Sequence, residues 1–340
     1  MVQKIDISTS SLLRLILLIL GIWFIYLIRD VLILLFLVVI IVAGLSPLTD
    51  RWSRYLTRPG AVVAIFLLFF IILTGVASLL IPPLVTQIRE FSNTLPETVK
   101  TFSQSSSTGF VDQVASLMVK NLDAISSQLG DIGGTIFTKT VGVINGVVAV
   151  LTVFVLTFYL LIDEHGIKKL YKGLLPPGSY EGLAETTRKI ALKLGAWLRG
   201  QLLLMVAVGS LVTIGLSIIG MPYALTLGVW AGITEVVPMV GPWIGAVPGV
   251  IVGLSISPLY GFLALIIYTV VQQLENNFLV PKIMSKAVGL NPVIVIVAIL
   301  IGGKLYGILG VLLAVPLAAV IGVLAEDWTQ VRASFSSPRK

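Results

Sequence analysis

The sequence predicts an all-α integral membrane protein: a polytopic helix bundle with two re-entrant, broken helical hairpins and a small extracytoplasmic helical insert. Its 340 residues are 57% hydrophobic and only 11% charged, whereas soluble domains carry about 25% charged residues. The long apolar runs approach or exceed the roughly 20 residues that a membrane helix needs. In the last third of the chain, glycines and prolines interrupt these runs, which predicts broken helices.

Residues 1–86 are expected to form the N-terminal transmembrane helices. Two apolar runs, Leu12–Ile28 and Val31–Leu45, are separated only by the charged pair Arg29 and Asp30. This pair favours a tight helical hairpin over one long tilted helix.

A third span is expected over Ala61–Val85, with Pro82 and Pro83 marking its far end because proline breaks helices. The preceding segment, Asp50–Arg58, is rich in arginine. Basic loops next to membrane helices face the cytoplasm, so we place this segment inside the cell.

Residues 87–140 are more polar and keep helical spacing of apolar residues on both sides of a flexible break at Ser103–Gly109. They predict an extracytoplasmic insert of amphipathic helices, which either covers helix ends or encloses an exit path. Residues 141–162 then form another span.

Residues 163–199 are rich in Lys and Arg and contain one amphipathic stretch. We expect cytoplasmic and interfacial helices here, which anchor the chain or couple a moving part to the membrane surface. Residues 200–328 are the predicted transport core, and residues 329–340 form a basic tail. Both termini are therefore expected in the cytoplasm.

Two segments of the core are expected to fold back within the membrane. If residues 224–256 crossed once, Lys282 and Lys286 would face the outside; if they dip in and return, both lysines lie in the cytoplasm, as basic residues prefer. Residues 291–324 repeat the pattern, with an interruption at Gly302–Gly307. Paired interrupted segments that enter from opposite faces are typical of transporter sites near the bilayer midplane.

Small and ring-constrained residues are expected to shape these hairpins. Glycines four residues apart let helices approach closely, and prolines bend or end them. The predicted hairpin-shaping residues are Pro238, Gly241, Pro242, Gly245, Pro248, Gly249 and Gly253 in the first hairpin, and Pro292, Gly302, Gly303, Gly307 and Pro316 in the second.

Glu235 is the only ionisable residue of the Asp, Glu, Lys, Arg and His types between Arg199 and Glu275. A carboxylate in such an apolar run is costly unless it faces water, a partner or a substrate. We predict that Glu235 binds a proton, a cation or a polar substrate group. The alternative is a carboxylate at the water interface or hydrogen-bonded to open hairpin backbone.

A second polar group of candidate pathway residues follows the apolar run Leu259–Leu274. It comprises Gln272, Gln273, Glu275, Asn276 and Asn277. These side chains suit a hydrated path and suit an ordinary helix end equally well. Lys304, the only charge between Lys286 and Glu326, could pair with an acid, attract an anionic substrate or extend to the membrane surface.

Several classes of function are disfavoured. The chain has no cysteine and one histidine, which removes thiolate chemistry and two-histidine metal sites. It lacks a nucleophile-elbow motif and a phosphate-binding loop, so we expect neither an enzyme nor a bound cofactor or metal. The basic residues behind the net charge of +7 lie mainly beside membrane segments, so this charge does not predict nucleic-acid binding. Active transport would draw on an ion gradient or a partner.

An ordered set of motifs carries a family resemblance. The motifs are Trp197-Leu-Arg-Gly-Gln201, Glu235-Val-Val-Pro-Met-Val-Gly-Pro242 with Gly245 and Pro248, Asn277-Phe-Leu-Val-Pro-Lys282, Val288-Gly-Leu-Asn-Pro292, and Gly302-Gly-Lys-Leu-Tyr-Gly-Ile-Leu-Gly310 with Pro316. The chain resembles the autoinducer-2 exporter family, also called PerM-like permeases, over nearly its whole length.

This resemblance implies a homo-oligomer, such as a pentamer, in the cell membrane of a prokaryote. Some family members are associated with export of autoinducer-2, and others with exchange of sodium or lithium for protons. Three functions stay open: a secondary exporter of a small polar solute that works by movement of a hairpin-containing unit, a sodium or lithium/proton antiporter, and a non-transporting membrane scaffold. The expected partners are the lipid bilayer and a small polar solute, or a monovalent cation and a proton.

Overall fold

The computed structural model describes residues 9–105, 140–163, 180–287 and 289–328. In this part of the chain the secondary structure is helical, with no strand. Five of the described helices are long and apolar enough to cross a membrane. The predicted fold class, an all-α membrane protein, is confirmed.

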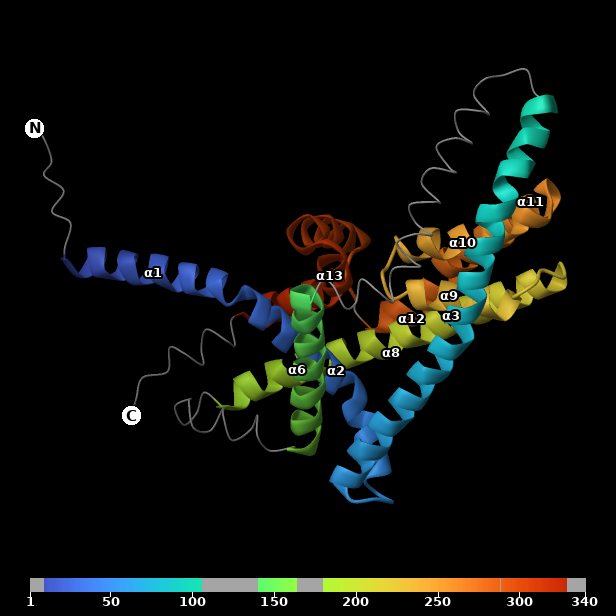
Figure 1. Ribbon diagram of the computed structural model, residues 1–340. Coiled ribbons are helices and arrows are strands. Elements are labelled where there is room, and N and C mark those ends of the chain that lie inside the picture. The colour runs from blue at the N-terminus through green and yellow to red at the C-terminus, as the bar shows by residue number, and fades with distance from the viewer. Residues whose placement is uncertain (1–8, 106–139, 164–179, 288, 329–340) are drawn as a thin grey trace, which may run out of the picture.

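The helices follow one another along the chain as Figure 1 labels them. They are α1 (Thr9–Leu27), α2 (Arg29–Trp52), α3 (Arg58–Ser105), α6 (Thr140–Ile162), α8 (Tyr180–Ile218), α9 (Ala224–Thr234), α10 (Gly241–Ile256), α11 (Pro258–Leu274), the π-helical turn η1 (Glu275–Leu279), α12 (Val280–Ala287) and α13 (Pro292–Glu326).

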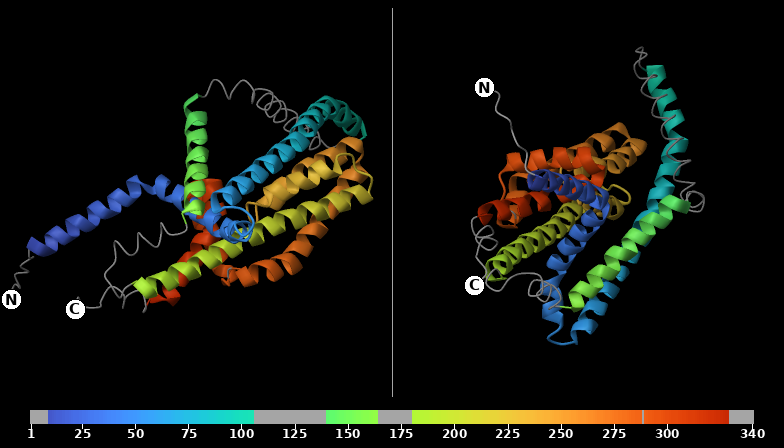
Figure 2. Two further views of the ribbon diagram at one scale, coloured as in Figure 1. Left: turned by 90° about the horizontal axis from the view of Figure 1, so that it is seen from below. Right: turned by 90° about the vertical axis from the view of Figure 1, so that its left-hand side faces the viewer.

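The predicted hairpin between the first two helices is wrong. Only Ile28 separates α1 from α2, and the backbone N–H of Leu32 donates to the carbonyl of Ile28 at 3.0 Å, so the chain barely leaves helical geometry. Figures 1 and 2 show α1 extending away from the remaining helices. Arg29 lies 3.8 Å from Asp30 and stacks over the ring of Tyr26 at 4.3 Å. These contacts accommodate both charges without a reversal of the chain.

The third helix, α3, does not end at Pro82 and Pro83 but continues to Ser105. Prolines remove backbone donors, yet membrane helices often continue through them. The 48 residues of α3 correspond to about 72 Å at the usual rise, so the helix extends well beyond a bilayer core of about 30 Å. Its last turns belong to the predicted insert, and residues 106–139 of that insert lie outside the described residues.

The central element is α8, a single helix of 39 residues. It runs without a break across the expected boundary between the interfacial segment and the core at residues 199 and 200. Helices α2, α9, α11, α12 and α13 all contact it, and its two halves take part in two separate apolar cores.

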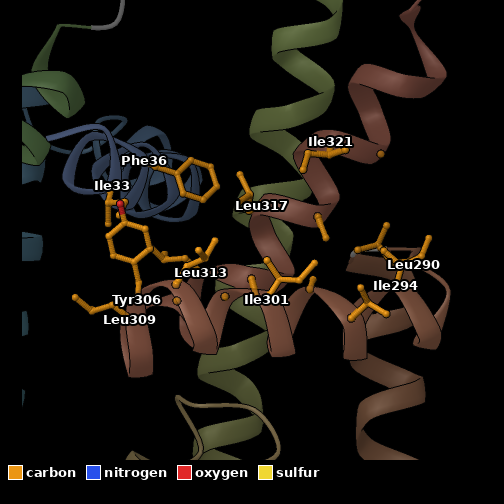
Figure 3. Close-up of a pocket in the computed structure, with 18 of the residues that line it drawn as sticks. Ile33, Phe36, Leu290, Ile294, Ile301, Tyr306, Leu309, Leu313, Leu317 and Ile321 are labelled. Carbon is orange, nitrogen blue, oxygen red and sulfur yellow. The ribbon is translucent and has the colours of Figure 1, made fainter. Parts of the chain in front are cut away.

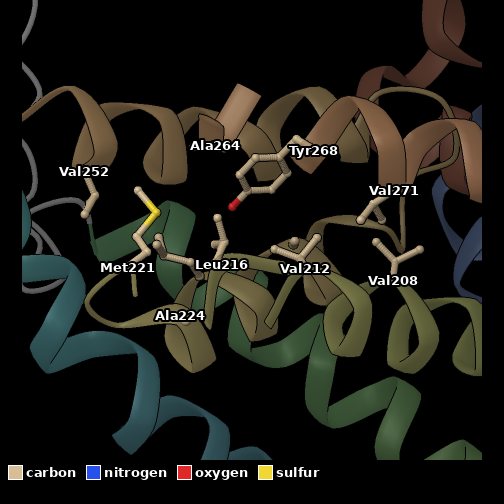
Figure 4. Close-up of a cluster of buried hydrophobic side chains, with 11 residues drawn as sticks. Val208, Val212, Leu216, Met221, Ala224, Val252, Ala264, Tyr268 and Val271 are labelled. Carbon is tan, nitrogen blue, oxygen red and sulfur yellow. The ribbon is translucent and has the colours of Figure 1, made fainter. Parts of the chain in front are cut away.

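The first core joins the second half of α8 to α9, α10 and α11 (Figure 4). Buried side chains of α8 meet the ring of Tyr268 and its apolar neighbours on α11. Glycines bring α8 and α9 together: a Cβ on Gly209 would lie 2.9 Å from the carbonyl oxygen of Gly228 and 3.4 Å from Cα of Gly232. Larger side chains at these positions would force the two helices apart.

The first predicted hairpin is present as a helix–turn–helix. Helix α9 has 11 residues and α10 has 16, or about 16 and 24 Å, and each is too short to cross a bilayer core of about 30 Å. The indole N–H of Trp230 donates to the carbonyl of Ile244 at 3.3 Å across the hairpin. Between the helices, Met239 adopts a φ of 66°. Re-entry of this hairpin into the lipid bilayer stays a prediction.

The second predicted hairpin is also present, within α13. Its break falls at Tyr306 (φ −136°, ψ 16°) and Gly307 (φ 58°, ψ −135°), the last two residues of the predicted interruption. The two arms then run back along each other, and a Cβ on Gly302 would overlap the backbone of Gly310. This hairpin forms the second core with the first half of α8 and with α2, so the two hairpins pack on different stretches of α8.

A cavity of about 820 Å³ lies between the two arms of α13 and the start of α2 (Figure 3). Leucine, isoleucine and valine side chains dominate its wall, and Tyr306 carries the only side-chain hydroxyl among the lining residues. Such a wall offers few hydrogen bonds to a polar solute, so we place the candidate site elsewhere.

Candidate functional site

Glu235 lies at the tip of the first hairpin, where α9 ends. Its backbone N–H donates to the carbonyl of Ala231 at 3.1 Å, which closes the last turn of α9. Only 2% of the residue is exposed. Glu235 is therefore enclosed by protein and does not lie at an open water interface, which was one of the alternatives expected from the sequence.

Gln201 on α8 forms a hydrogen bond with this tip. Its side-chain Nε2 donates to the backbone carbonyl of Glu235 at 2.6 Å, and the bond is buried. Gln201 belongs to a family motif but is not one of the predicted site residues. The feature of the sequence that could have identified Gln201 is its polar amide at the start of the long apolar run that follows Arg199.

Glu275 is the second carboxyl of the site. It begins η1 at the end of α11 and is 5% exposed. Its side chain lies next to the side chain of Glu235, and the two carboxyls interact directly. The fold therefore brings together two acids from the hairpin tip and from the following membrane helix.

The π-helical turn at Glu275 has a local cause in the sequence. Proline lacks an N–H, and its ring collides with the carbonyl four residues earlier in a regular α-helix. Pro281 would meet the carbonyl of Asn277 in this way, and a wider turn directly before it relieves the conflict. Within the turn Glu275 is buried, whereas Asn276 and Asn277 are exposed. Such π turns often occur at functional sites.

No positive charge from the described residues balances the two carboxyls. Among the described groups, the electrostatic influences on Glu235 and Glu275 come from burial and from each other, not from Lys, Arg or His. Oxygen Oε2 of Glu235 is buried without a donor in the described part of the chain. Burying an uncompensated carboxylate pair is very costly, so the pair can hold a proton or another single cation.

Among the described residues, no hydrogen bond or ion pair joins the remaining polar candidates to this pair. Gln272 is half-buried, and the amide of Asn277 donates to the backbone and side-chain oxygens of Gln273 at 2.9 and 3.1 Å. Asn277 thus forms hydrogen bonds within its own helical segment. Lys304 is exposed on α13, which packs against a different stretch of α8, so it is not brought to the carboxyl pair.

The four regularly spaced glycines of α10 all lie at close helix contacts. Gly241 and Gly245 face α9, and a Cβ on Gly245 would lie 2.7 Å from Oγ1 of Thr234. Gly249 and Gly253 face α11, where a Cβ would meet the ring of Tyr268 or the backbone of Tyr260.

The predicted prolines occupy three kinds of position. Pro242 and Pro292 occupy the first turns of α10 and α13, where a missing N–H costs nothing. Pro238 lies in the hairpin turn, and Pro248 and Pro316 lie inside helices without ending them.

Comparison with known proteins gives the family. The model of the AI-2E family of transporters matches residues 12–330. The chain belongs to the AI-2E transporter family. This is the family expected from the motifs, and it is a class of transporters rather than of enzymes. Together with the five apolar helices, membership makes the chain a multi-pass membrane protein with a role in transport.

Several AI-2E relatives have names that propose a transport role. YueF of Bacillus subtilis is 32% identical over 81% of this chain and 78% of its own length. YrrI of the same organism is 30% identical over 85% of this chain and 84% of its own length. PerM of Escherichia coli, named as a permease, is 25% identical over 73% of this chain and 69% of its own length.

Proposed function

We propose that this protein is a secondary transporter that exports a small polar solute, similar to autoinducer-2, from a prokaryotic cell. The observation that carries the proposal is the carboxyl pair of Glu235 and Glu275 inside the bundle, at the tip of a hairpin too short to be a full span. Ionisable groups within membrane segments usually mark substrate or ion pathways. Membership of the AI-2E family supports the same class of function.

In this proposal the first hairpin moves relative to α8. The glycine contacts bring the backbones of α9 and α8 close together, and the hydrogen bond from Gln201 to Glu235 holds the tip in the position that the structure shows. Helices α2 and α3 would serve as the scaffold. Breaking one buried hydrogen bond costs about 1 kcal/mol net, which thermal motion can supply during a transport cycle.

The proposed setting is the cytoplasmic membrane, with both termini in the cytoplasm and a homo-oligomeric assembly, such as a pentamer. The basic residues around Arg54 and in the segment before Arg199 support this orientation, because cytoplasmic loops are enriched in Lys and Arg. The lipid bilayer would cover the exposed leucine, isoleucine and phenylalanine side chains of the outer helices.

Metabolite-resolved flux in proteoliposomes tests the proposal. Wild-type protein should move a small polar solute, whereas Gly245→Leu should stop the movement, since its side chain would push α10 away from Thr234 and Ala231. The matched control is Gly146→Leu on α6, where a Cβ would meet nothing within 4 Å. If folded Gly245→Leu retained full flux, the movement of the hairpin would be contradicted. If the folded wild type moved no solute, a non-transporting scaffold would explain the protein better.

A second candidate, exchange of sodium or lithium for protons, is favoured by the absence of a balancing cation at the carboxyl pair within the described structure. Such a pair could hold either a proton or a monovalent metal ion in turn. Adding sodium or lithium to proteoliposomes that contain a pH-sensitive dye tests this function. Proton movement without any organic solute would favour the antiporter, and no movement would favour solute export.

A further inference from the structure

We propose that Glu235 and Glu275 share one exchangeable proton and that this proton couples hairpin movement to the proton gradient. The proton site follows from the burial of both carboxyls, from the unpartnered Oε2 of Glu235 and from the contact between the two side chains. Its role in coupling rests on the transport function proposed above.

The neighbouring side chains of Glu235 and Glu275 can bond to each other only through a hydrogen. Ionised carboxylates are acceptors only, and a carboxyl donates only when it carries a proton. A hydrogen bond between the neighbouring side chains of Glu235 and Glu275 therefore needs one hydrogen for the two groups. That hydrogen would also supply a donor at the pair, where Oε2 of Glu235 otherwise has none among the described residues.

On the elements that surround the pair, no described cation contacts either carboxyl. Helices α9 and α10 contribute no charged residue other than Glu235, which follows α9. On α8 the nearest cation in sequence, Arg199, is exposed and reaches the carbonyl of Gly44 at 3.4 Å. On α12, Lys282 is exposed. Tyr268, on α11, is a neutral group whose buried hydroxyl lies among apolar side chains.

No described cation therefore neutralises the pair. Two adjacent ionised carboxyls would repel each other strongly in a medium of low dielectric. Groups of three or more metal-ligating side chains are absent from the described residues, which disfavours a divalent metal ion at this place. A proton is the charge that lets the two side chains bond to each other directly, because a protonated carboxyl can donate to its neighbour.

The shared proton can exchange with water when the hairpin tip moves. Glu235 belongs to the hairpin turn, whereas Glu275 belongs to the π-helical turn of the next helix, so a shift of the tip separates them. Separation removes the shared hydrogen bond and exposes both groups to water, and the proton passes to that water. Return of the tip requires a new proton. One proton would thus be bound and released in each cycle of hairpin movement.

Infrared spectroscopy of the purified full-length protein tests the proton site without any transport assay. At neutral pH the wild type should show the C=O stretch of a protonated carboxyl, and this band should shift in D₂O. Glu235→Gln and Glu275→Gln should each remove or displace it. The matched control is Glu185→Gln, an exposed acid on α8, which should leave the band unchanged.

Two results would overturn the proposal. One is a folded wild type that shows no protonated carboxyl at neutral pH, and the other is a band that both pair variants leave intact. Because the first result concerns the wild type, it does not depend on whether either variant folds.

Flux measurements separate this inference from the proposed function. Stimulation of solute flux by a proton gradient should be lost in Glu275→Gln while the Glu185→Gln control keeps it. If the wild type moves no solute or cation, the transport function fails although the infrared band stands. If solute moves but the band is absent, the proton site fails and the transport function stands.

Discussion

At the scale of single residues, the tip of the first hairpin depends on one amide. Gln201 donates to the carbonyl of Glu235 at 2.6 Å, and both residues are buried. The substitution Gln201→Leu keeps the approximate volume but leaves that carbonyl without its donor. An unsatisfied buried acceptor costs about 1–3 kcal/mol, so thermal unfolding in detergent should occur at a lower temperature. Leu202→Ala, at a neighbouring lipid-facing position, is the control, and equal effects of both changes would contradict this role for Gln201.

A second residue-level link joins the end of α13 to α8. The ammonium group of Lys189, 2.9 Å from the carboxylate of Asp327, and the hydroxyl of Thr186, at 3.0 Å, both donate to it. The Lys189 hydrogen bond, with a smaller contribution from Thr186, holds the pKa of Asp327 below its ordinary value. A carboxyl whose pKa is lowered in the folded state stabilises the fold at pH values above its ordinary pKa. This stabilisation is lost as the pH falls through the pKa of the folded state.

The stability of Asp327→Asn should therefore be lower than that of the wild type at neutral pH. The difference should shrink in acid, as the wild-type carboxylate takes up a proton. Unfolding temperatures measured across a pH series check this prediction. Glu326→Gln is the control, because its partner Lys193 lies at 3.7 Å on an exposed surface, where ion pairs contribute little. Parallel pH curves for wild type and Asp327→Asn would refute the link.

At the scale of elements, the second hairpin depends on the backbone conformation of one glycine. Gly307 combines a φ of 58° with a ψ of −135°, a region that residues with a Cβ rarely enter. A Cβ there would meet nothing within 4 Å, so Gly307→Ala tests backbone strain without steric overlap. We expect a loss of about 1–3 kcal/mol in unfolding free energy. Gly75→Ala, in the middle of α3 with equally open space, should be neutral or slightly stabilising. A similar response from both variants would show that the turn tolerates other conformations.

The elements also show what the sequence could predict. Hydropathy located the spans, and the spacing of glycine and proline located both hairpins, because these features act locally. The hairpin at Arg29 and Asp30 was wrong, since neighbouring side chains can satisfy two charges within a helix. The stop at Pro82 was wrong because a proline removes a donor without forcing a long helix to end.

The candidate site was predictable only in part. Glu235 stands out by its isolation in apolar sequence, but Glu275 was one member of a polar group without distinction from Asn276 and Asn277. Its burial depends on the π-helical turn before Pro281, and its contact with Glu235 depends on how far the hairpin extends along α8. Neither quantity follows from local spacing. The role of Gln201 could not be predicted for the same reason, because its partner is a backbone carbonyl in the hairpin turn, 34 residues away in the sequence.

At the scale of the whole molecule, the first hairpin decides on which side of the membrane the following helix ends. If α9 and α10 together enter and leave by the same face, α11 returns the chain to the side from which α8 started. Lys282 on α12 then shares a side with Arg54, which lies in the loop between α2 and α3. If the hairpin crossed the membrane, the two residues would lie on opposite sides.

Single-cysteine labelling tests this central claim most directly, because the chain contains no native cysteine. Membrane-impermeant maleimide would be applied to right-side-out and inside-out vesicles that contain Arg54→Cys, Lys282→Cys or Tyr223→Cys, each at a position exposed in the structure. We predict that Arg54→Cys and Lys282→Cys react only from the cytoplasmic side and that Tyr223→Cys reacts only from the outside. Labelling of Lys282→Cys from the outside would show that residues 224–256 cross the membrane, and it would contradict a carboxyl pair carried on a re-entrant hairpin.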